Sequence, residues 1–264
     1  MKKLPITAIV VGLNEGKLLS ICLSSIDFCD EILYIDLGSN DDSVAVATSH
    51  GANVIFHERV MFVEIIHSKF ANQTKHDWIL ITDPDELVDK SLYEEIYFLF
   101  TNGMQESIGA ITVPWLFYFK HKHLKGTPWG GINRRVLIVN NKRFLFAPMV
   151  HVGRKLQDGF ISKDLDFLDR NVVHHFWMQG YFKLLEKHLR YLKVEGSARY
   201  YSGQRTSLKQ ILIEPFRQFK YGYIIKKGYK DGITGILLSL FWAWYQTFSL
   251  ISLFRYQFKM NSFQ

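Results

Sequence analysis

The chain has 264 residues, 48% of them hydrophobic, and a formal net charge of +7. This is enough apolar sequence to bury a sizeable core, and it suits one large α/β domain, alone or with an appendage. Its two cysteines, Cys22 and Cys29, have neither metal-ligand nor redox spacing, which excludes a cysteine-based site and indicates reduced thiols in a cytosolic protein.

Strand and helix patterns alternate through the first hundred residues. Asn14 is placed to cap the first helix, and Asp41 or Asp42 to cap the second. A βαβα order of this kind predicts a mostly parallel sheet with helices on both faces. The expected strands are residues 6–11, 31–36, 53–57 and 78–82, and the expected helices are about 18–26, 43–50, 64–75 and 91–100.

Polar and acidic residues follow three of these strands. Ligands of parallel sheets bind beyond the carboxyl ends of the strands, so we expect these residues to face one crevice. They are Asn14 and Glu15 after the first strand, Asp36, Gly38, Ser39 and Asp41 around the end of the second, and Asp83, Asp85 and Glu86 after the fourth.

The middle of the chain has weaker patterns. Residues 108–114 and 135–139 resemble strands, and a basic loop that contains Gly and Trp lies between them at 120–131. From residue 179 onward leucines recur at spacings of three and four, which predicts that helices fill most of the remaining sequence.

Residues 205–264 carry the whole net charge, with nine Lys or Arg against two acids. A basic tail needs an anionic partner, either nucleic acid or anionic lipid. The basic residues lie on either side of an uncharged run of 23 residues, 232–254, and not within it. This arrangement favours an anionic membrane surface over nucleic acid.

The uncharged run is long enough to span a bilayer, for which about 20 residues suffice. However, Gly235, Ser239, Ala243 and Gln246 form a stripe of small and polar residues on one helical face. A spanning helix has no use for such a stripe unless it packs on something. We therefore expect a helix that lies in the interface or docks on the folded domain, with headgroup contacts from Lys220, Lys226, Lys227 and Lys230.

The segment Asp83-Pro84-Asp85-Glu86 carries the strongest chemical signal. Proline disfavours the helical region for the preceding residue, so Asp83 is expected to stay extended and to point the same way as Asp85. Two neighbouring carboxylates suit a hard cation, Mg²⁺ or Mn²⁺, which can bridge a diphosphate and neutralise a leaving group when a sugar–phosphate bond breaks. The alternative is that these acids cap the next helix.

The loop from Asp36 to Ser43 carries the second signal. A carboxylate at a strand end can accept a hydrogen bond from a base or a ribose hydroxyl, and Gly38 allows close approach of the backbone. The loop has one glycine and no phosphate-binding lysine, so it suits a nucleoside better than a phosphate. The alternative is an ordinary turn between a strand and a helix.

Together these segments resemble the family 2 glycosyltransferases, and more narrowly the branch that includes lipopolysaccharide-core glucosyltransferases. The resemblance covers residues 4–100 with ordered motifs and continues more loosely to the C-terminus. The matching segments are 9–15, Asp30-Glu31-Ile32, 36–41, 51–54, 77–80 and 83–86, followed by Trp129-Gly130-Gly131, Arg134-Arg135, His151, His174 and 228–235.

The resemblance implies a GT-A fold, Rossmann-like and mostly parallel, with a helical C-terminal extension. It also implies inverting transfer from a nucleotide-diphosphate sugar, with a UDP-sugar favoured, and a bound Mg²⁺ or Mn²⁺. The implied metal ligands are Asp83, Asp85 and His151. The implied substrate-binding residues are Asn14, Glu15, Asp36, Gly38, Ser39, Lys69, Asp83, Trp129 and Arg134.

The chain departs from the branch at two places. The branch usually has a Gln/Lys-Arg-Asn segment where residues 66–72 contain no Arg, so Lys69 is expected to substitute without a bidentate fork. The branch also tends to have His-Glu at His151-Val152. Inverting transfer needs a base that takes the proton of the acceptor hydroxyl. Histidines such as His174 and His175 are more often structural, so we do not count them as candidates. The candidates for the base are Asp158, Asp164, Asp166 and Glu86.

The predicted function is transfer of a sugar to a lipid-linked or oligosaccharide acceptor in a surface glycan such as lipopolysaccharide core. The alternatives are a catalytically impaired homologue that binds a nucleotide-sugar, and a nucleotidyltransferase. We expect a donor-binding half in residues 1–100, an acceptor-side half in 101–204 and a membrane-associating extension in 205–264. The expected location is the cytoplasm, peripheral on the inner face of the cell membrane.

Overall fold

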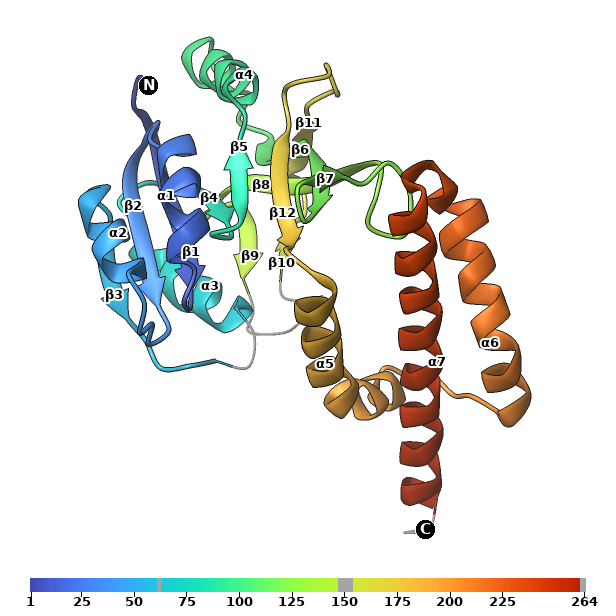
Figure 1. Cartoon of the computed structure of the whole chain (residues 1–264). Coiled ribbons are helices and arrows are strands. Elements are labelled where there is room, and N and C mark those ends of the chain that lie inside the picture. The colour runs from blue at the N-terminus through green and yellow to red at the C-terminus, as the bar shows by residue number, and fades with distance from the viewer. Residues whose placement is uncertain (61–62, 147–153, 262–264) are drawn as a thin grey trace. The chain divides into compact units, whose positions relative to one another are not determined.

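The computed structural model describes residues 1–60, 63–146 and 154–261 (Figure 1). The chain divides into two compact units. The first comprises Met1–Trp115 and Asn133–His175, and the second comprises Leu116–Ile132 and Phe176–Gln264. The functional division at residues 100 and 204 remains a prediction.

Four parallel strands form one half of the main sheet, in the order β3 (Asn53–Phe56), β2 (Cys29–Asp36), β1 (Leu4–Gly12) and β4 (Trp78–Thr82). Gly12 pairs with Asp36, and Val10 pairs with Thr82. The carboxyl ends of β1, β2 and β4 therefore meet at one edge of the sheet, which we call the carboxyl edge.

Beyond β4 the sheet becomes mixed. Strand β8 (Ile132–Asn140) is antiparallel to β4, and β6 (Ile108–Phe119), β12 (Val173–Met178) and β5 (Glu86–Val88) follow in that order. Strand β12 is antiparallel to β5, and β11 (Ile161–Asp164) is parallel to β6. The shorter strands are β7 (Lys122–His123) on β6 and the separate pair β9 (Phe144–Phe146) and β10 (Arg154–Leu156).

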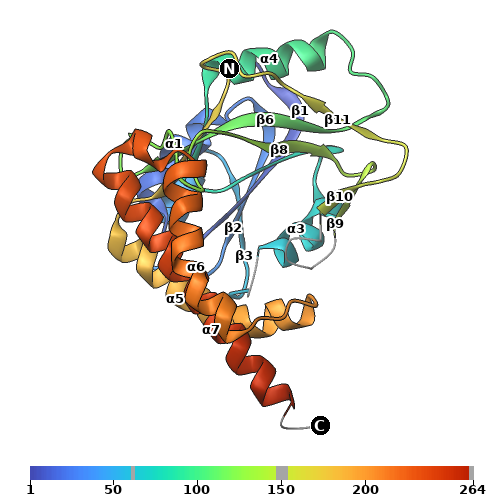
Figure 2. The same cartoon turned by 90° about the vertical axis from the view of Figure 1, so that its right-hand side faces the viewer.

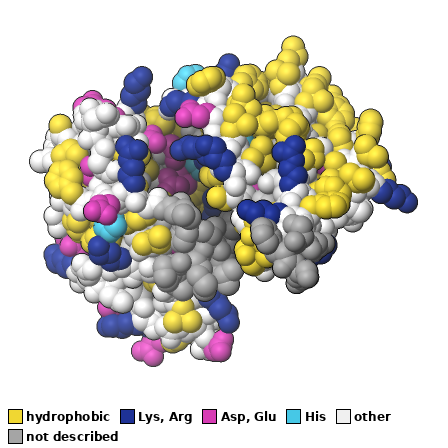
Figure 3. Space-filling view, turned by 90° about the horizontal axis from the view of Figure 1, so that it is seen from below, with side chains coloured by type: hydrophobic (Ala, Val, Ile, Leu, Met, Phe, Trp, Pro, Cys, Tyr) yellow, Lys and Arg dark blue, Asp and Glu magenta, His cyan; other side chains and the backbone are white. Residues whose placement is uncertain are grey.

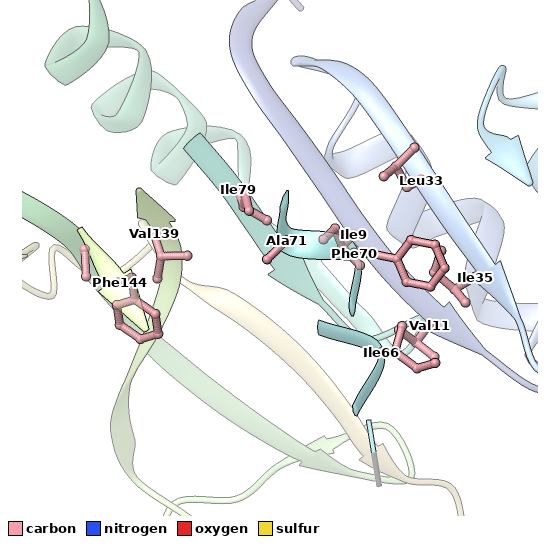
Figure 4. Packing of buried hydrophobic residues seen from close by; sticks show 11 residues of the cluster. Ile9, Val11, Leu33, Ile35, Ile66, Phe70, Ala71, Ile79, Val139 and Phe144 are labelled. Carbon is pink, nitrogen blue, oxygen red and sulfur yellow. The ribbon is translucent and has the colours of Figure 1, made fainter. Parts of the chain in front are cut away.

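Alternating side chains of the parallel strands are buried on both faces of the sheet, as in sheets covered by helices on both sides. Ile9 and Val11 of β1 pack with Ile66 and Phe70 of α3 (Glu64–Phe70) on one face (Figure 4). Val10, which points to the opposite face, is equally buried. The remaining helices of the first unit are α1 (Gly16–Ser25), α2 (Ser43–Ser49) and α4 (Lys90–Thr101), with a 3₁₀ turn η1 (Ala71–Gln73).

The second unit is mainly helical (Figure 2). Helices α5 (Tyr181–Tyr201) and α6 (Leu208–Lys220) both pack on the long α7 (Ile233–Asn261). Between α6 and α7 lie a π-helical turn, η2 (Tyr221–Ile225), and a 3₁₀ turn, η3 (Gly228–Asp231). The fully buried Asp231 accepts hydrogen bonds from the backbone N–H groups of Lys125 (2.8 Å) and Gly126 (2.7 Å), so it ties the 120–131 loop to η3.

The expected α/β architecture with a helical C-terminal extension is confirmed, and several local predictions are corrected. Helix α3 ends at Phe70 and not near residue 75, and the strand that begins at Ile108 runs on to Phe119. Asn14 does not cap α1: its φ is +58°, and Glu15 is the N-cap residue. The stripe on α7 does pack, because Gly235, Ser239 and Ala243 are all buried.

Candidate functional site

Hydrogen bonds lock the loop after β1 to the loop after β2. The backbone N–H of Asn14 donates to Ser39 Oγ (2.9 Å), and the side-chain oxygen of Asn14 accepts from the N–H of Asn40 (2.9 Å). The N–H of Glu15 donates to Ser43 Oγ (2.9 Å). The side chain of Asn14 is thus used across the two loops, which explains why it does not cap its own helix.

Asp36 is buried at the end of β2, with 1% of its surface exposed. Its Oδ2 atom accepts from the N–H groups of Gly38 and Ser39, both at 3.0 Å, and Gly38 has the positive φ (+88°) that this tight turn requires. Its Oδ1 atom is buried and has no hydrogen-bond partner in the part of the chain that the structure describes. An ordinary turn accounts for Oδ2 but leaves the buried Oδ1 without an explanation.

Lys69 lies at the same edge as Asp36. Its ammonium group is 3.0 Å from His57 Nε2, and His57 Nδ1 is 2.8 Å from the carbonyl oxygen of Glu58. If Nδ1 donates to that carbonyl, Nε2 is the atom that accepts from Lys69. The N–H of His57 in turn donates to the carbonyl oxygen of Asp36 (2.9 Å). The predicted donor-binding lysine is therefore held near the predicted nucleoside contact.

The segment after β4 is a turn, so Asp83 and Asp85 do not lie on one extended segment as expected. The N–H of Glu86 donates to the carbonyl oxygen of Asp83 (3.0 Å), and Pro84 occupies the second position of the turn, where its fixed φ is favourable. The Glu86 carboxylate braces the turn from inside, because its Oε2 accepts from Thr82 Oγ1 (2.9 Å) and from the N–H of Asp83 (3.0 Å). Asp83 is exposed and Asp85 is partly buried.

His175 joins this turn from β12. Strands β12 and β5 place it opposite Glu86, with His175 Nε2 3.3 Å from Asp85 Oδ2 and Nδ1 3.6 Å from Glu86 Oε1. Burial raises the pKa of Glu86 to about 7, and the charge of Asp83 adds to the rise. Burial alone would lower the pKa of His175, but the hydrogen bond to Asp85 and the nearby carboxylates outweigh it, so the pKa is raised.

The donor set of this turn fits a divalent cation that shares its coordination with a substrate. Asp83 and Asp85 both lie close enough to Glu86 to raise its pKa. Mg²⁺ is commonly held by one or two carboxylates together with substrate phosphates, so two carboxylates fit this mode of binding. Within residues 1–60, 63–146 and 154–261, no group of three His, Cys, Asp or Glu is arranged to hold a metal by itself. His151, the third predicted ligand, lies outside the described residues.

The four candidate bases are not brought together. Glu86 is buried inside the turn, with its carboxylate engaged as described. Asp158 is fully exposed and follows Gln157, whose N–H donates to the carbonyl oxygen of Arg143. The segment around Arg143 lies near the beginning of β4, because the N–H of Asn141 donates to the carbonyl oxygen of Asp77. Asp158 therefore lies away from the carboxyl edge.

Asp164 and Asp166 are exposed. The Asp166 carboxylate is 3.2 Å from Arg134, which also donates to the carbonyl oxygen of Leu165 (2.9 Å). Because β8 is antiparallel to β4, its first residues, including Arg134, lie toward the edge at which β4 ends. Of the four candidate bases, Asp166 is thus paired with an arginine, Arg134, near the carboxyl edge.

Trp129 belongs to the second unit, where it is packed in an aromatic cluster. It stacks on Trp177 with ring centroids 4.6 Å apart and meets the edge of Trp242 at 5.4 Å. This packing accounts for Trp129 without a ligand, and its predicted substrate contact stays a prediction.

Sequence reasoning missed His175, which it treated as structural. The signal that places it in the site is the pairing of β12 with β5, between residues almost ninety positions apart in the chain. Such a pairing leaves no local pattern in the sequence.

No family model matches the chain. An uncharacterized glycosyltransferase of Rickettsia conorii is 24% identical over 246 residues, which cover 90% of this chain and 86% of the relative. A second uncharacterized glycosyltransferase, of Rickettsia felis, is 25% identical over 246 residues, with 90% and 85% covered. The lipopolysaccharide core biosynthesis glycosyltransferase LpsC of Rhizobium meliloti is 33% identical over 96 residues, 35% of this chain and 36% of LpsC.

Among solved structures, glucosyl-3-phosphoglycerate synthase from Mycobacterium tuberculosis in complex with Mn²⁺ and uridine-diphosphate-glucose is 20% identical and covers 43% of each chain, with a TM-score of 0.35. The two Rickettsia proteins match almost the whole sequence, including both units. The chain is therefore related to bacterial glycosyltransferases over 90% of its length, which confirms the resemblance that its motifs predicted.

Proposed function

We propose that this protein is a glycosyltransferase that takes a sugar from a nucleotide-diphosphate donor, with a UDP-sugar favoured. The observation that carries the proposal is the arrangement of acids at the carboxyl edge. Asp36 ends β2 with one oxygen that has no hydrogen-bond partner among the described residues. Asp83 and Asp85 follow β4, and β1 lies between these two strands. This arrangement suits a ligand with a nucleoside at one end and a diphosphate at the other.

Each residue of the edge has a role in this proposal. Asp36 Oδ1 accepts from a hydroxyl or an N–H of the nucleoside, and Lys69 faces the donor's negative charge. Asp83 and Asp85 hold Mg²⁺ or Mn²⁺, and the bound cation neutralises charge on the departing nucleoside diphosphate. Glu86 fixes the turn that carries both ligands, and His175 orients the Asp85 carboxylate.

Inverting transfer needs one group to accept the proton of the acceptor hydroxyl. Asp164 and Asp166 are exposed, whereas Glu86 is buried and Asp158 lies near the beginning of β4. We therefore favour Asp164 or Asp166 as the base. Replacing each by Asn should separate them, because the true base is needed for transfer but not for donor binding.

We propose a surface glycan such as lipopolysaccharide core as the acceptor, lipid-linked or as an oligosaccharide, and a peripheral location on the cytoplasmic face of the cell membrane. The similarity to LpsC over 35% of the chain supports the choice of acceptor. The basic charge of residues 205–264 supports the membrane location.

A donor-hydrolysis screen tests the proposal. The full chain is incubated with a panel of nucleotide-sugars, with added Mn²⁺ or Mg²⁺ or with EDTA, and release of the nucleoside diphosphate is measured. We expect release from at least one donor, only with the cation. Donor binding without hydrolysis or transfer would identify an impaired homologue, and transfer of a nucleotidyl group would identify a nucleotidyltransferase.

A further inference from the structure

Helix α6 turns its apolar side outward. Leu208, Leu212, Ile213 and Phe216 recur at helical spacing and are each more than half exposed, with Phe216 at 77%. We call these four side chains the α6 face. The buried side chain of the helix is a carboxylate, Glu214, which is 3% exposed.

The side of α6 that points into the unit is mixed, because the buried Glu214 lies there with the partly buried Ile211, Pro215 and Gln218. Glu214 pairs with Arg217 (2.6 Å) and accepts from Gln218 (2.8 Å), and Gln218 accepts from the indole N–H of Trp242 on α7 (2.8 Å). A cavity of about 360 Å³ lies beside these residues and is lined by Arg199 and Arg205, and also by Ile213 at the border of the α6 face. A helix at a protein–water surface buries its apolar stripe and exposes its polar one. Helix α6 instead buries a carboxylate and exposes three large apolar side chains, Leu208, Leu212 and Phe216, which marks its outer side as a contact surface.

Helix α7 also exposes apolar side chains. Helices α5 and α6 both pack on α7, where Ser249 donates to Glu195 of α5 (3.1 Å) and Trp242 donates to Gln218 of α6 (2.8 Å). Ile233, Leu237 and Leu240 recur at spacings of four and three and remain exposed. In Figure 3, hydrophobic side chains gather over the helices of this unit, with Lys and Arg side chains beside them.

The charges around the α6 face identify its partner. Both acids of residues 205–261, Glu214 and Asp231, are buried. The basic residues around them are exposed, among them Lys209, Lys220, Lys226, Lys227 and Lys230. An apolar surface with exposed lysines beside it, on a segment whose two acids are buried, matches an anionic bilayer, in which lysines meet headgroups and apolar side chains reach the acyl boundary. A second copy of the chain would bring like charges together.

We propose that α6 lies flat on an anionic lipid surface with the α6 face inserted at the acyl boundary, and that α7 rests beside it without crossing the bilayer. This deepens the membrane location within the proposed function and moves the contact from the uncharged 232–254 run to α6. With 13 residues, α6 is too short to span.

Helix α7 is long and apolar enough to span by length and composition. However, Tyr245 and Gln246, near its middle, hydrogen-bond to Glu195 and Arg199 of α5. A spanning α7 would carry those charges into hydrocarbon, where charged side chains are strongly disfavoured.

The test is binding of the full chain to vesicles of phosphatidylcholine with and without phosphatidylglycerol, measured by cosedimentation without any sugar donor. The double variant Leu212→Gln/Phe216→Gln should bind anionic vesicles at least about tenfold more weakly. The matched control is Leu168→Gln/Phe98→Gln, which changes a Leu and a Phe of similar exposure in the first unit and should bind like the wild type. Thermal unfolding checks that both variants fold.

An environment-sensitive fluorophore on Leu212→Cys should shift to shorter wavelength on anionic vesicles, and the same label on Leu168→Cys should not. Unchanged vesicle binding by the α6 double variant, or an unshifted label at 212, would overturn the proposal. Resistance to alkaline carbonate would show a spanning α7, and a dimer lost in the α6 variant without vesicle binding would assign the face to a second copy. Donor hydrolysis is measured separately in solution, so failure here leaves the proposed activity untouched.

Discussion

Replacing the buried Glu86 by Gln should change how the stability of the fold depends on pH. Burial raises the pKa of Glu86 to about 7, from an ordinary value of 4.5 that it regains on unfolding. The unfolded chain therefore binds fewer protons than the folded chain between these two values, and the free energy of unfolding falls as the pH rises. The difference corresponds to at most about 3 kcal/mol.

His175 acts in the same direction. Its raised pKa contributes stability that is present below its ordinary value of 6.5 and is lost as the pH rises through its folded value. Gln at position 86 keeps an oxygen that can accept from Thr82 and from the N–H of Asp83, and it removes the buried charge. The variant should match the wild type at about pH 5 and exceed it by about 1–3 kcal/mol at about pH 8.

Urea unfolding in EDTA, followed by circular dichroism at both pH values, measures this difference without a bound cation. The exposed Glu106→Gln serves as the control and should change stability equally little at both pH values. If Glu86→Gln and the wild type lose the same stability between the two pH values, Glu86 is not a buried acid with a raised pKa, and the reasoning fails.

Three further substitutions test other parts of the structure. Asp85→Ala should lower turnover roughly a thousandfold or more while the fold is kept, and EDTA should do the same; full activity in either case would refute a cation at this turn. Asp36→Asn should weaken donor binding by about 1–3 kcal/mol in calorimetry, because the free oxygen can no longer be a charged acceptor; unchanged affinity would remove the nucleoside assignment. Asp231→Asn should lower the free energy of unfolding by about 1–3 kcal/mol, since only one side-chain oxygen is left for the N–H groups of Lys125 and Gly126, and urea melts would detect it.

The carboxyl edge could be predicted from sequence because its parts are local. Continuous apolar runs define β1, β2 and β4, and a parallel sheet brings their ends together whatever the details of the loops. The position of Asp36 follows from this rule, as does the proximity of the 83–86 segment. The shape of that segment does not, because the proline rule constrains Asp83 alone and ignores the Glu86 side chain that closes the turn.

Other contacts of the predicted residues depend on the tertiary fold and could not be predicted from the sequence. Asn14 has the side chain of a helix cap, yet its oxygen accepts from Asn40 in the neighbouring loop. His175 meets Asp85 only because β12 returns antiparallel to β5, and Trp129 meets Trp177 only within the second unit. A sequence shows which bonds a side chain can make, and the tertiary fold selects among them.

The tertiary fold also decides which side of helix α6 is exposed. Its spacing of Leu208, Leu212 and Phe216 has the period of a helix that buries an apolar stripe, and read alone it predicts a core position. The side with Glu214 is the one that packs, because Glu214, Gln218 and the indole of Trp242 satisfy one another there. Because those polar groups bond to one another inside the unit, Leu208, Leu212 and Phe216 stay exposed, and the surrounding lysines favour lipid as the medium that covers them.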